Sequence, residues 1–224
     1  MSPVRAVLFD ALGTLVALEP PGPRLRLALR ELGGVDVGPE AADRASQAEI
    51  AHYLVHHMEG ADEAGLERLR DDCAAVMGEA LGVPELDQAT VRRAMLESLE
   101  LAPFPDAAPA LRALRGRGLR LVVASNWDCS LPVWLQRAGL GELLDGAVSS
   151  AVVGEPKPAT AVFRAALALA GAAAEEAVHV GDSVENDVRG ARGAGIRALL
   201  IVRGGERPKG VESVGSLEEL PSLI

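Results

Sequence analysis

Two kinds of hydrophobic pattern follow one another along the chain. Near the N-terminus, an apolar run from Val4 to Phe9, interrupted only by Arg5, ends at Asp10 and is followed by a Gly-Thr turn. A short apolar run bounded by turn residues is typical of a buried parallel strand. We therefore predict a first strand that delivers Asp10 to its C-terminal end.

The next stretch, from about residue 20 to residue 101, has a different pattern. Its apolar residues recur with helical spacing, and no alternating strand pattern interrupts them. Glycine and proline place breaks at Gly33-Gly34, Gly60 and Gly82-Val83-Pro84. We predict an all-helical insertion over residues 19–101, with helices near 23–33, 40–58, 62–81 and 88–100.

In the second half of the chain, predicted strands and helices alternate, which is typical of parallel β-α units. The strands are expected at 119–125, 146–149, 177–180 and 197–202, and the helices near 106–117, 131–138, 159–170, 185–193 and 216–220. With the first strand, these units make a sheet of five or six strands. The fold class is therefore α/β, with residues 1–18 and 102–224 as a parallel-sheet core that the helical insertion interrupts.

Composition narrows the classes of partner. Since 49% of the 224 residues are hydrophobic, the chain can bury a core. It has no apolar run of about 18 residues and no targeting pattern, so we expect a soluble, cytoplasmic protein with no membrane partner. The net charge of −10 argues against binding to nucleic acid but allows a small phosphorylated substrate. Cys73 and Cys129 fit neither a disulfide framework nor a zinc site.

Polar side chains follow several of the predicted strands. These are Asp10, Ser125-Asn126 and Asp182, and a further loop presents Lys157 between two prolines. Singly, each has an ordinary explanation as a turn residue, a solvated charge or a helix-start acid. However, the C-terminal ends of parallel strands share one edge of the sheet, where α/β proteins bind ligands. Because oxygen ligands suit Mg²⁺, we expect Asp10 and Asp182 to hold Mg²⁺ while Lys157 and Ser125 bind an anionic substrate.

Four sequence blocks, in this order and spacing, resemble the motifs of the haloacid dehalogenase-like (HAD) hydrolase superfamily. They are Phe9-Asp10-Ala11-Leu12-Gly13-Thr14-Leu15, Ala124-Ser125-Asn126, Lys157-Pro158, and Val180-Gly181-Asp182-Ser183 with Asp187. Each block alone is a weak signal, whereas the four together are specific. The resemblance implies a Rossmann-like parallel-sheet core and, over residues 19–101, a helical cap domain that covers the active site.

The resemblance also implies roles for the matched residues. Asp10 would be the nucleophile that forms a covalent aspartyl intermediate. Thr14 and Ser125 would bind the transferring group, and Asn126 would contribute to substrate binding. Lys157 would offset the negative charge of the nucleophile and the substrate.

For the metal, the resemblance implies Mg²⁺ bound by Asp10 and Asp182. The backbone carbonyl of Leu12 would complete the protein ligands. Asp187 would be a supporting acid, near either the metal or Lys157.

Leu12 is where the chain departs from the family's phosphatases. They carry at this position a second Asp, which protonates the leaving oxygen and then activates water. A leucine side chain moves no proton, and the loss of a general acid–base group typically costs ~10²–10⁴ in rate. Asp128 is the nearest replacement acid in the sequence, although a solvated loop acid or a helix cap is its more ordinary explanation.

Two alternatives stand beside a phosphatase. The superfamily's metal-independent 2-haloacid dehalogenases carry an Asp-Ala-aromatic-Gly-Thr motif that residues 10–14 partly resemble, and Arg44 lies in a segment similar to one in which an Arg binds the leaving group or the carboxylate. Against this, Asp182 and Val184 replace the first Ser and the Asn of their Ser-Ser-Asn pattern. The third hypothesis is a catalytically silent HAD-fold binding protein.

The main prediction combines these observations. It is a HAD-like hydrolase, a Mg²⁺-dependent phosphatase acting on a small phosphorylated metabolite through Asp10, weakened or made sensitive to the leaving group by Leu12. We expect a monomer or a homodimer.

Overall fold

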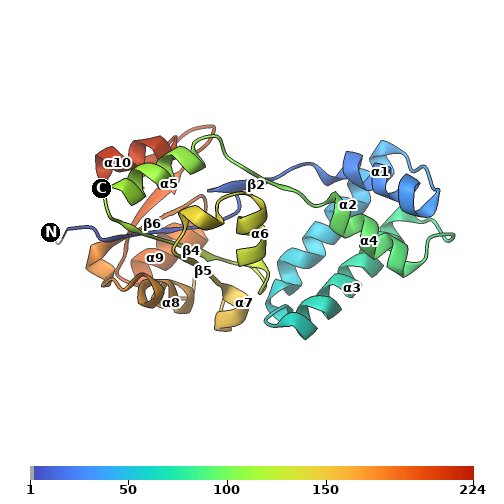
Figure 1. Cartoon of the computed structure of the whole chain (residues 1–224), viewed down its shortest axis with the longest axis horizontal. Coiled ribbons are helices and arrows are strands. Elements are labelled where there is room, and N and C mark those ends of the chain that lie inside the picture. Colours follow the sequence, from blue (N-terminus) through green and yellow to red (C-terminus); the bar gives the residue numbers. More distant parts are fainter. Residues whose placement is uncertain (1–2) are drawn as a thin grey trace. The chain divides into compact units, whose positions relative to one another are not determined.

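The computed structural model describes residues 3–224 and divides into two compact units. The first unit comprises Met1–Ala17 and Ala102–Ile224, and the second comprises Leu18–Leu101 (Figure 1). The chain leaves the first unit after Ala17 and returns to it at Ala102. The second unit is thus an insertion into the sequence of the first.

The first unit is built on a six-stranded sheet in which every pair of neighbouring strands is parallel. In spatial order the strands are β5 (Gly146–Ser149), β4 (Arg120–Ser125), β1 (Ala6–Phe9), β6 (Ala177–Gly181), β7 (Arg197–Ile201) and β8 (Ser213–Val214). All four residues of β1 are buried, because β1 lies between β4 and β6 near the middle of the sheet. This arrangement confirms the predicted α/β class and the parallel sheet.

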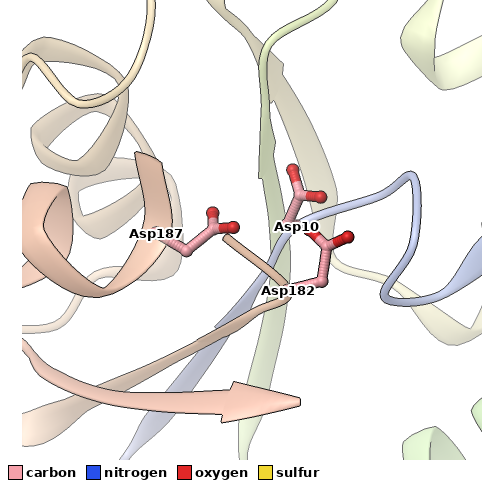
Figure 2. A group of neighbouring side chains, drawn as sticks. All are labelled: Asp10, Asp182 and Asp187. Carbon is pink, nitrogen blue, oxygen red and sulfur yellow. The ribbon is translucent and has the colours of Figure 1, made fainter. Parts of the chain in front are cut away.

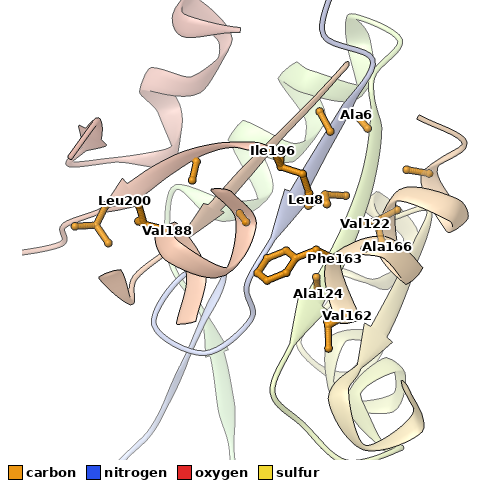
Figure 3. Packing of buried hydrophobic residues seen from close by; sticks show 14 residues of the cluster. Ala6, Leu8, Val122, Ala124, Val162, Phe163, Ala166, Val188, Ile196 and Leu200 are labelled. Atoms are coloured by element: carbon orange, nitrogen blue, oxygen red, sulfur yellow. The ribbon is translucent and has the colours of Figure 1, made fainter. Parts of the chain in front are cut away.

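Helices pack against this sheet and bury its hydrophobic core. They are α5 (Ala107–Gly116), α6 (Leu131–Arg137), α7 (Ser150–Val153), α8 (Ala161–Ala170), α9 (Gly190–Gly193) and α10 (Leu220–Leu223). Phe163 on α8 packs among buried aliphatic side chains of β1 and β4, including Leu8 and Val122 (Figure 3). Full burial of a side chain of this size contributes about 1.5–3 kcal/mol, so this cluster is a major source of the stability of the unit.

One helical segment of the first unit departs from the α-helix expected near 185–193. Val184–Arg189 is a π-helix, and the short helix α9 continues from it. The side chain of Ser183 accepts a hydrogen bond from the backbone N–H of Asn186 and so caps the first turn. A π-helical turn is uncommon and is often found at functional sites.

The second unit is built mainly of helices. It contains α1 (Pro21–Gly33), α2 (Pro39–His56), the 3₁₀ turn His57–Glu59, α3 (Glu63–Leu81) and α4 (Gln88–Ser98). Asp62 and Asp87 cap the starts of α3 and α4 by accepting backbone N–H hydrogen bonds. Gly34 and Gly82 end α1 and α3 in the left-handed conformation, both with φ of 66°. No helix among residues 3–224 is long and apolar enough to cross a membrane.

Three short strands escaped the sequence prediction. Besides β8, they are β2 (Val16–Leu18) and β3 (Leu101–Pro103), which pair as a two-stranded sheet. Segments of two or three residues show too few alternations to reveal a strand period. The pairing of β2 with β3 also depends on the long-range return of the chain, which no local pattern contains.

Candidate active site

The C-terminal edge of the parallel sheet gathers acidic side chains from two strands and the helical segment that follows one of them. Asp10 directly follows β1, Asp182 directly follows β6, and Asp187 lies in the π-helix that comes next. One carboxylate oxygen from each lies within 4.8 Å of the others (Figure 2). Among residues 3–224, this is the group of side chains whose composition and spacing suit a metal ion. The edge is also where open α/β sheets bind ligands.

Lys157 joins two of these carboxylates from within the protein. Its Nζ lies 2.6 Å from Oδ1 of Asp10 and 2.6 Å from Oδ1 of Asp187, and the residue is 4% exposed. The Ser125 hydroxyl donates to the same oxygen of Asp10 over 2.9 Å. Burial disfavours the ammonium ion, but the two carboxylates outweigh this effect and raise the pKa of Lys157. Lys157 is therefore charged and fixed beside Asp10.

Asp187 is held on both of its oxygens. Its Oδ1 also lies 2.9 Å from Nε2 of His179, and its Oδ2 accepts the backbone N–H of Ser183 over 3.0 Å. Burial opposes ionisation, but Lys157 and His179 more than compensate, and the pKa of Asp187 is well below its ordinary value. Gly181 is required beneath it, because a Cβ there would lie 2.1 Å from Cγ of Asp187.

The other two carboxyl groups hold their protons more tightly than usual. Burial raises the pKa of Asp10, although Lys157 opposes the shift. Asp182 is exposed as a residue, but partial desolvation of its carboxyl group, with the negative charges of Asp10 and Asp187, raises its pKa to about 6. Three carboxylates thus face one ammonium ion. This excess of negative charge, carried by oxygen donors, fits a small divalent cation such as Mg²⁺.

The turn after Asp10 brings a hydroxyl to the same edge. Thr14 is fully buried, and its Oγ1 has no hydrogen-bond partner within the described chain. Gly13 precedes it with φ of 81°, and a Cβ at Gly13 would lie 2.1 Å from Oδ2 of Asp182. An unpaired buried hydroxyl costs about 1–3 kcal/mol, so Thr14 carries a group that lowers the stability of the fold.

Leu12 lies in the same turn, and its hydrocarbon side chain can neither donate nor accept a proton. The residue is 36% exposed, which is a high value for a leucine beside a buried polar cluster. Its backbone carbonyl remains the group that the sequence motif offers as a metal ligand. The side chain adds an apolar surface next to the carboxylates.

Asn126, predicted to contribute to substrate binding, contacts the Lys157 loop. Its Oδ1 accepts the backbone N–H of Lys157 over 2.7 Å, and its Nδ2 donates to the carbonyl of the same residue over 3.1 Å. Both ends of the amide are engaged by one residue that lies 31 positions away. Asn126 therefore positions Lys157.

Asp128, the candidate replacement acid, is tied to the start of α6. It is buried, and its Oδ1 accepts hydrogen bonds from the backbone N–H and the hydroxyl of Ser130. Contacts from an Asp side chain to the residue two positions on are those of an Asx-type turn, which here lies just ahead of α6. The structure thus favours the ordinary explanation of Asp128 over a role in proton transfer.

Arg44 is the one predicted site residue outside the first unit. It lies on α2 of the second unit, where it is exposed. The other predicted residues all belong to the first unit. Of these, Asp10, Ser125, Lys157 and Asp187 are linked by hydrogen bonds.

His179 is a site residue that sequence reasoning missed. It is fully buried within β6, where its ring contacts Phe163 edge-on with 5.0 Å between centroids and reaches Asp187 through Nε2. A lone histidine in an otherwise apolar strand is a weak signal, because most such residues serve packing alone. Its link to Lys157 through Asp187 appears only in three dimensions.

Comparison with known proteins places this geometry in a family. The sequence model of haloacid dehalogenase-like hydrolases matches residues 4–195, most of the chain. The phosphoserine phosphatase of Thermus thermophilus is 38% identical over 148 residues, which cover 63% of this chain and 59% of that protein. The chain spans about half the length of the curated relatives it matches.

Solved structures share the fold over nearly the whole length. A HAD phosphatase from Thermococcus onnurineus has a TM-score of 0.66 at 24% identity, with 98% of this chain and 97% of that chain covered. The L-2-haloacid dehalogenase of Xanthobacter autotrophicus has a TM-score of 0.69 at 21% identity, with 98% of each chain covered. These likenesses establish the common fold and do not separate a phosphatase from a dehalogenase. By its match to the family model, the chain belongs to the haloacid dehalogenase-like hydrolases.

Proposed function

We propose that this hydrolase is a Mg²⁺-dependent phosphatase that acts on a small phosphorylated metabolite through an aspartyl-phosphate intermediate on Asp10. The observation that carries the proposal is that three carboxylates gather at the sheet edge (Figure 2) beside the single ammonium ion of Lys157. A divalent cation would balance this charge, and together with Lys157 it would attract a phosphoryl group. The phosphoserine phosphatase among the relatives supports the same class of reaction.

Asp10 supplies the nucleophile. Ser125 and Lys157 hold its Oδ1 at 2.9 and 2.6 Å, so the carboxylate is oriented before a substrate arrives. Attack of a carboxylate oxygen on phosphorus forms the aspartyl phosphate, while the bond to the leaving oxygen breaks and its electron pair departs with that oxygen. Water then attacks the intermediate, which releases inorganic phosphate and restores Asp10.

Bound Mg²⁺ would supply electrostatic stabilisation of the phosphoryl oxygens. Asp10 and Asp182 would hold it, together with the carbonyl of Leu12. Asp187 has a different part, because its two oxygens already accept hydrogen bonds from Lys157 and the Ser183 backbone. It keeps Lys157 charged and in place, and Thr14 offers its unpaired hydroxyl to a phosphoryl oxygen.

Leu12 sets the expected substrate preference. With no acid at this position, the leaving oxygen departs unprotonated, which favours leaving groups of low pKa. We expect kcat/KM for 4-nitrophenyl phosphate to exceed that for a simple alkyl phosphate by about 10²-fold or more. Leu12→Asp would raise the alkyl rate and narrow this ratio.

The assay uses both substrates with Mg²⁺ and, in parallel, with EDTA. Asp10→Asn serves as the control that must lose activity on both substrates. Equal rates on the two substrates, unchanged by Leu12→Asp, would remove the leaving-group argument. Full activity in EDTA would contradict the metal requirement.

A metal-independent 2-haloacid dehalogenase is the second candidate, and Leu12 is the observation in its favour. A halide leaves without a proton, so this reaction needs no acid at that position. The site weighs against it, because Asp182 and Asp187 beside a metal-free Asp10 repel its carboxylate. Chloride release from 2-chloropropionate in EDTA would establish the dehalogenase over the phosphatase.

A further inference from the structure

Arg203 binds the turn that follows Asp10. It lies two residues beyond the end of β7, and its guanidinium donates through Nε to the carbonyl of Gly13 over 3.3 Å and through Nη2 to the carbonyl of Thr14. These carbonyls lie 190 and 189 positions away in the sequence. The contact therefore joins the far end of the sheet core to the turn that carries the unpaired Thr14 hydroxyl.

The guanidinium of Arg203 lies in a slot formed by Asp106 and Phe104. Its Nη1 donates to both oxygens of Asp106, at 3.0 and 3.2 Å, and its Cζ lies 3.5 Å from the centre of the Phe104 ring. Asp106 is fixed in turn by the Ser216 hydroxyl and the Leu217 backbone N–H, each at 2.9 Å. Partial burial opposes ionisation of Asp106, but these donors and Arg203 outweigh it and lower its pKa.

Arg203 binds carbonyls that the hydrogen bonds within the turn do not use. The turn's own hydrogen bonds use backbone N–H groups, from Gly13 to the carbonyl of Val16 and from Leu15 and Val16 to the carbonyl of Ala11. Gly13 must keep a positive φ and lie against the Asp182 carboxylate. A shift of the turn would move Thr14 relative to Asp10 and disturb the contact of Gly13 with the Asp182 carboxylate, and displacements near 1 Å at such sites cost about 10²-fold in rate.

We propose that Arg203, held by Asp106 and Phe104, is a positioning residue for the reaction. It fixes the Gly13-Thr14 turn, which follows the nucleophile in the chain and lies against the Asp182 carboxylate at Gly13. Only the planar fork of donors on an arginine can meet two carbonyls and a carboxylate together, whereas a lysine ammonium is a single point charge. The inference rests on the proposed function, because the rate it explains is that of phosphoryl transfer.

The test compares the two arginines at opposite ends of the same strand. Arg197 begins β7 and also binds a carboxylate, that of Glu212, and a backbone carbonyl, that of Leu223, but it does not contact the turn. We expect Arg203→Lys and Arg203→Ala to lower kcat for 4-nitrophenyl phosphate by about 10- to 100-fold, with KM changed less than about threefold. Arg197→Lys and Arg197→Ala are expected to keep kcat within about twofold.

Chemical rescue separates positioning from general destabilisation. The slot formed by Phe104 and Asp106 stays in Arg203→Ala, so millimolar guanidinium is expected to restore part of its kcat. The double variant Arg203→Ala/Asp106→Asn lacks the carboxylate that binds the cation, and we expect no rescue there. Equal loss of kcat in the Arg197 and Arg203 variants, without rescue, would overturn the inference.

A second readout does not depend on activity. Amide hydrogen exchange of residues 11–16 reports the turn directly, and we expect it to speed up in Arg203→Ala but not in Arg197→Ala. Absence of phosphatase activity in the unmodified protein would contradict the proposed function. Amide exchange would then still test whether Arg203 fixes the turn. Unchanged exchange in Arg203→Ala would overturn the inference, whatever the activity.

Discussion

At the scale of single residues, Thr14 gives the candidate site a buried polar group that weakens the fold. The hydroxyl of Thr14 is buried without a hydrogen-bond partner among residues 3–224, although its neighbours Gly13 and Leu15 lie in a well-bonded turn. Such a group is retained in a folded protein when a ligand satisfies it. Thr14 is therefore where stability and activity are expected to oppose each other.

Thr14→Val tests this trade-off, because valine has the same shape without the hydroxyl. We expect the free energy of unfolding to rise by about 1 kcal/mol, since an unsatisfied buried group is removed. The same change is expected to lower kcat/KM for 4-nitrophenyl phosphate by about tenfold or more. Denaturant titration and steady-state kinetics measure the two effects. A drop in stability together with unchanged kinetics would show that the hydroxyl serves the fold.

Asp182 sets the expected pH dependence of metal binding. Its pKa of about 6 in the metal-free protein lies above the ordinary value of 3.8, so the folded chain binds this proton more tightly than the unfolded chain. Its contribution to stability is present below about pH 3.8 and is lost as the pH rises through about 6.

Mg²⁺ binds the ionised form of Asp182, so the affinity for Mg²⁺ is expected to be constant above about pH 6 and to fall up to about tenfold per pH unit below it. Calorimetric titration with Mg²⁺ from pH 5 to 8 would show this break. Asp182→Asn is expected to bind weakly with no break near pH 6.

At the scale of elements, helix α2 buries an acid that its neighbours do not neutralise. Glu49 is 4% exposed, and burial raises its pKa to about 7, although a hydrogen bond with Cys73 on α3 opposes the shift. The folded second unit thus favours the protonated acid. Its stabilising effect is complete below about pH 4.5 and is lost as the pH rises through about 7.

Glu49→Gln removes this titration while keeping the shape of the side chain. As the pH rises from 5 to 8, the unmodified chain loses the contribution of Glu49, whereas the variant does not. We therefore expect the difference in unfolding free energy between them to change by an amount on the order of 3 kcal/mol in favour of the variant. Denaturant midpoints at the two pH values measure the difference. Glu79→Gln, at an exposed position of α3, is the matched control and is expected to show no such change. A pH-independent effect of Glu49→Gln would contradict the burial argument.

The elements themselves follow closely from sequence pattern. The buried strand β1 and the glycine-terminated helices α1 and α3 lie where periodicity and turn residues predict them. The π-helix at Val184–Arg189 does not, because its wider turn depends on Asp187 reaching back to Ser183 and across to Lys157. Local pattern predicts a helix there but contains no information on its pitch.

At the scale of the whole molecule, the excess negative charge of the site predicts a stabilising effect of Mg²⁺. A ligand at a hundred times its dissociation constant stabilises the native state by about 2.7 kcal/mol. We therefore expect saturating Mg²⁺ to raise the melting temperature, and EDTA to reverse the rise. Asp182→Asn is expected to abolish the shift, whereas Glu185→Gln, an exposed acid outside the cluster, is expected to keep it. An equal shift in both variants would point to Mg²⁺ bound elsewhere on this acidic chain.

The sequence by itself determined the parallel sheet, the helical insertion and the edge at which the polar side chains meet. Those features follow from hydrophobic period and from the shared direction of parallel strands, which are local or topological properties. Only the tertiary structure decided what Asn126, Asp128, His179 and Arg203 contact. The physical reason is that a hydrogen bond depends on a few tenths of an ångström and on direction. The partner of Arg203 in the nucleophile turn lies 190 positions away, beyond the reach of any local pattern.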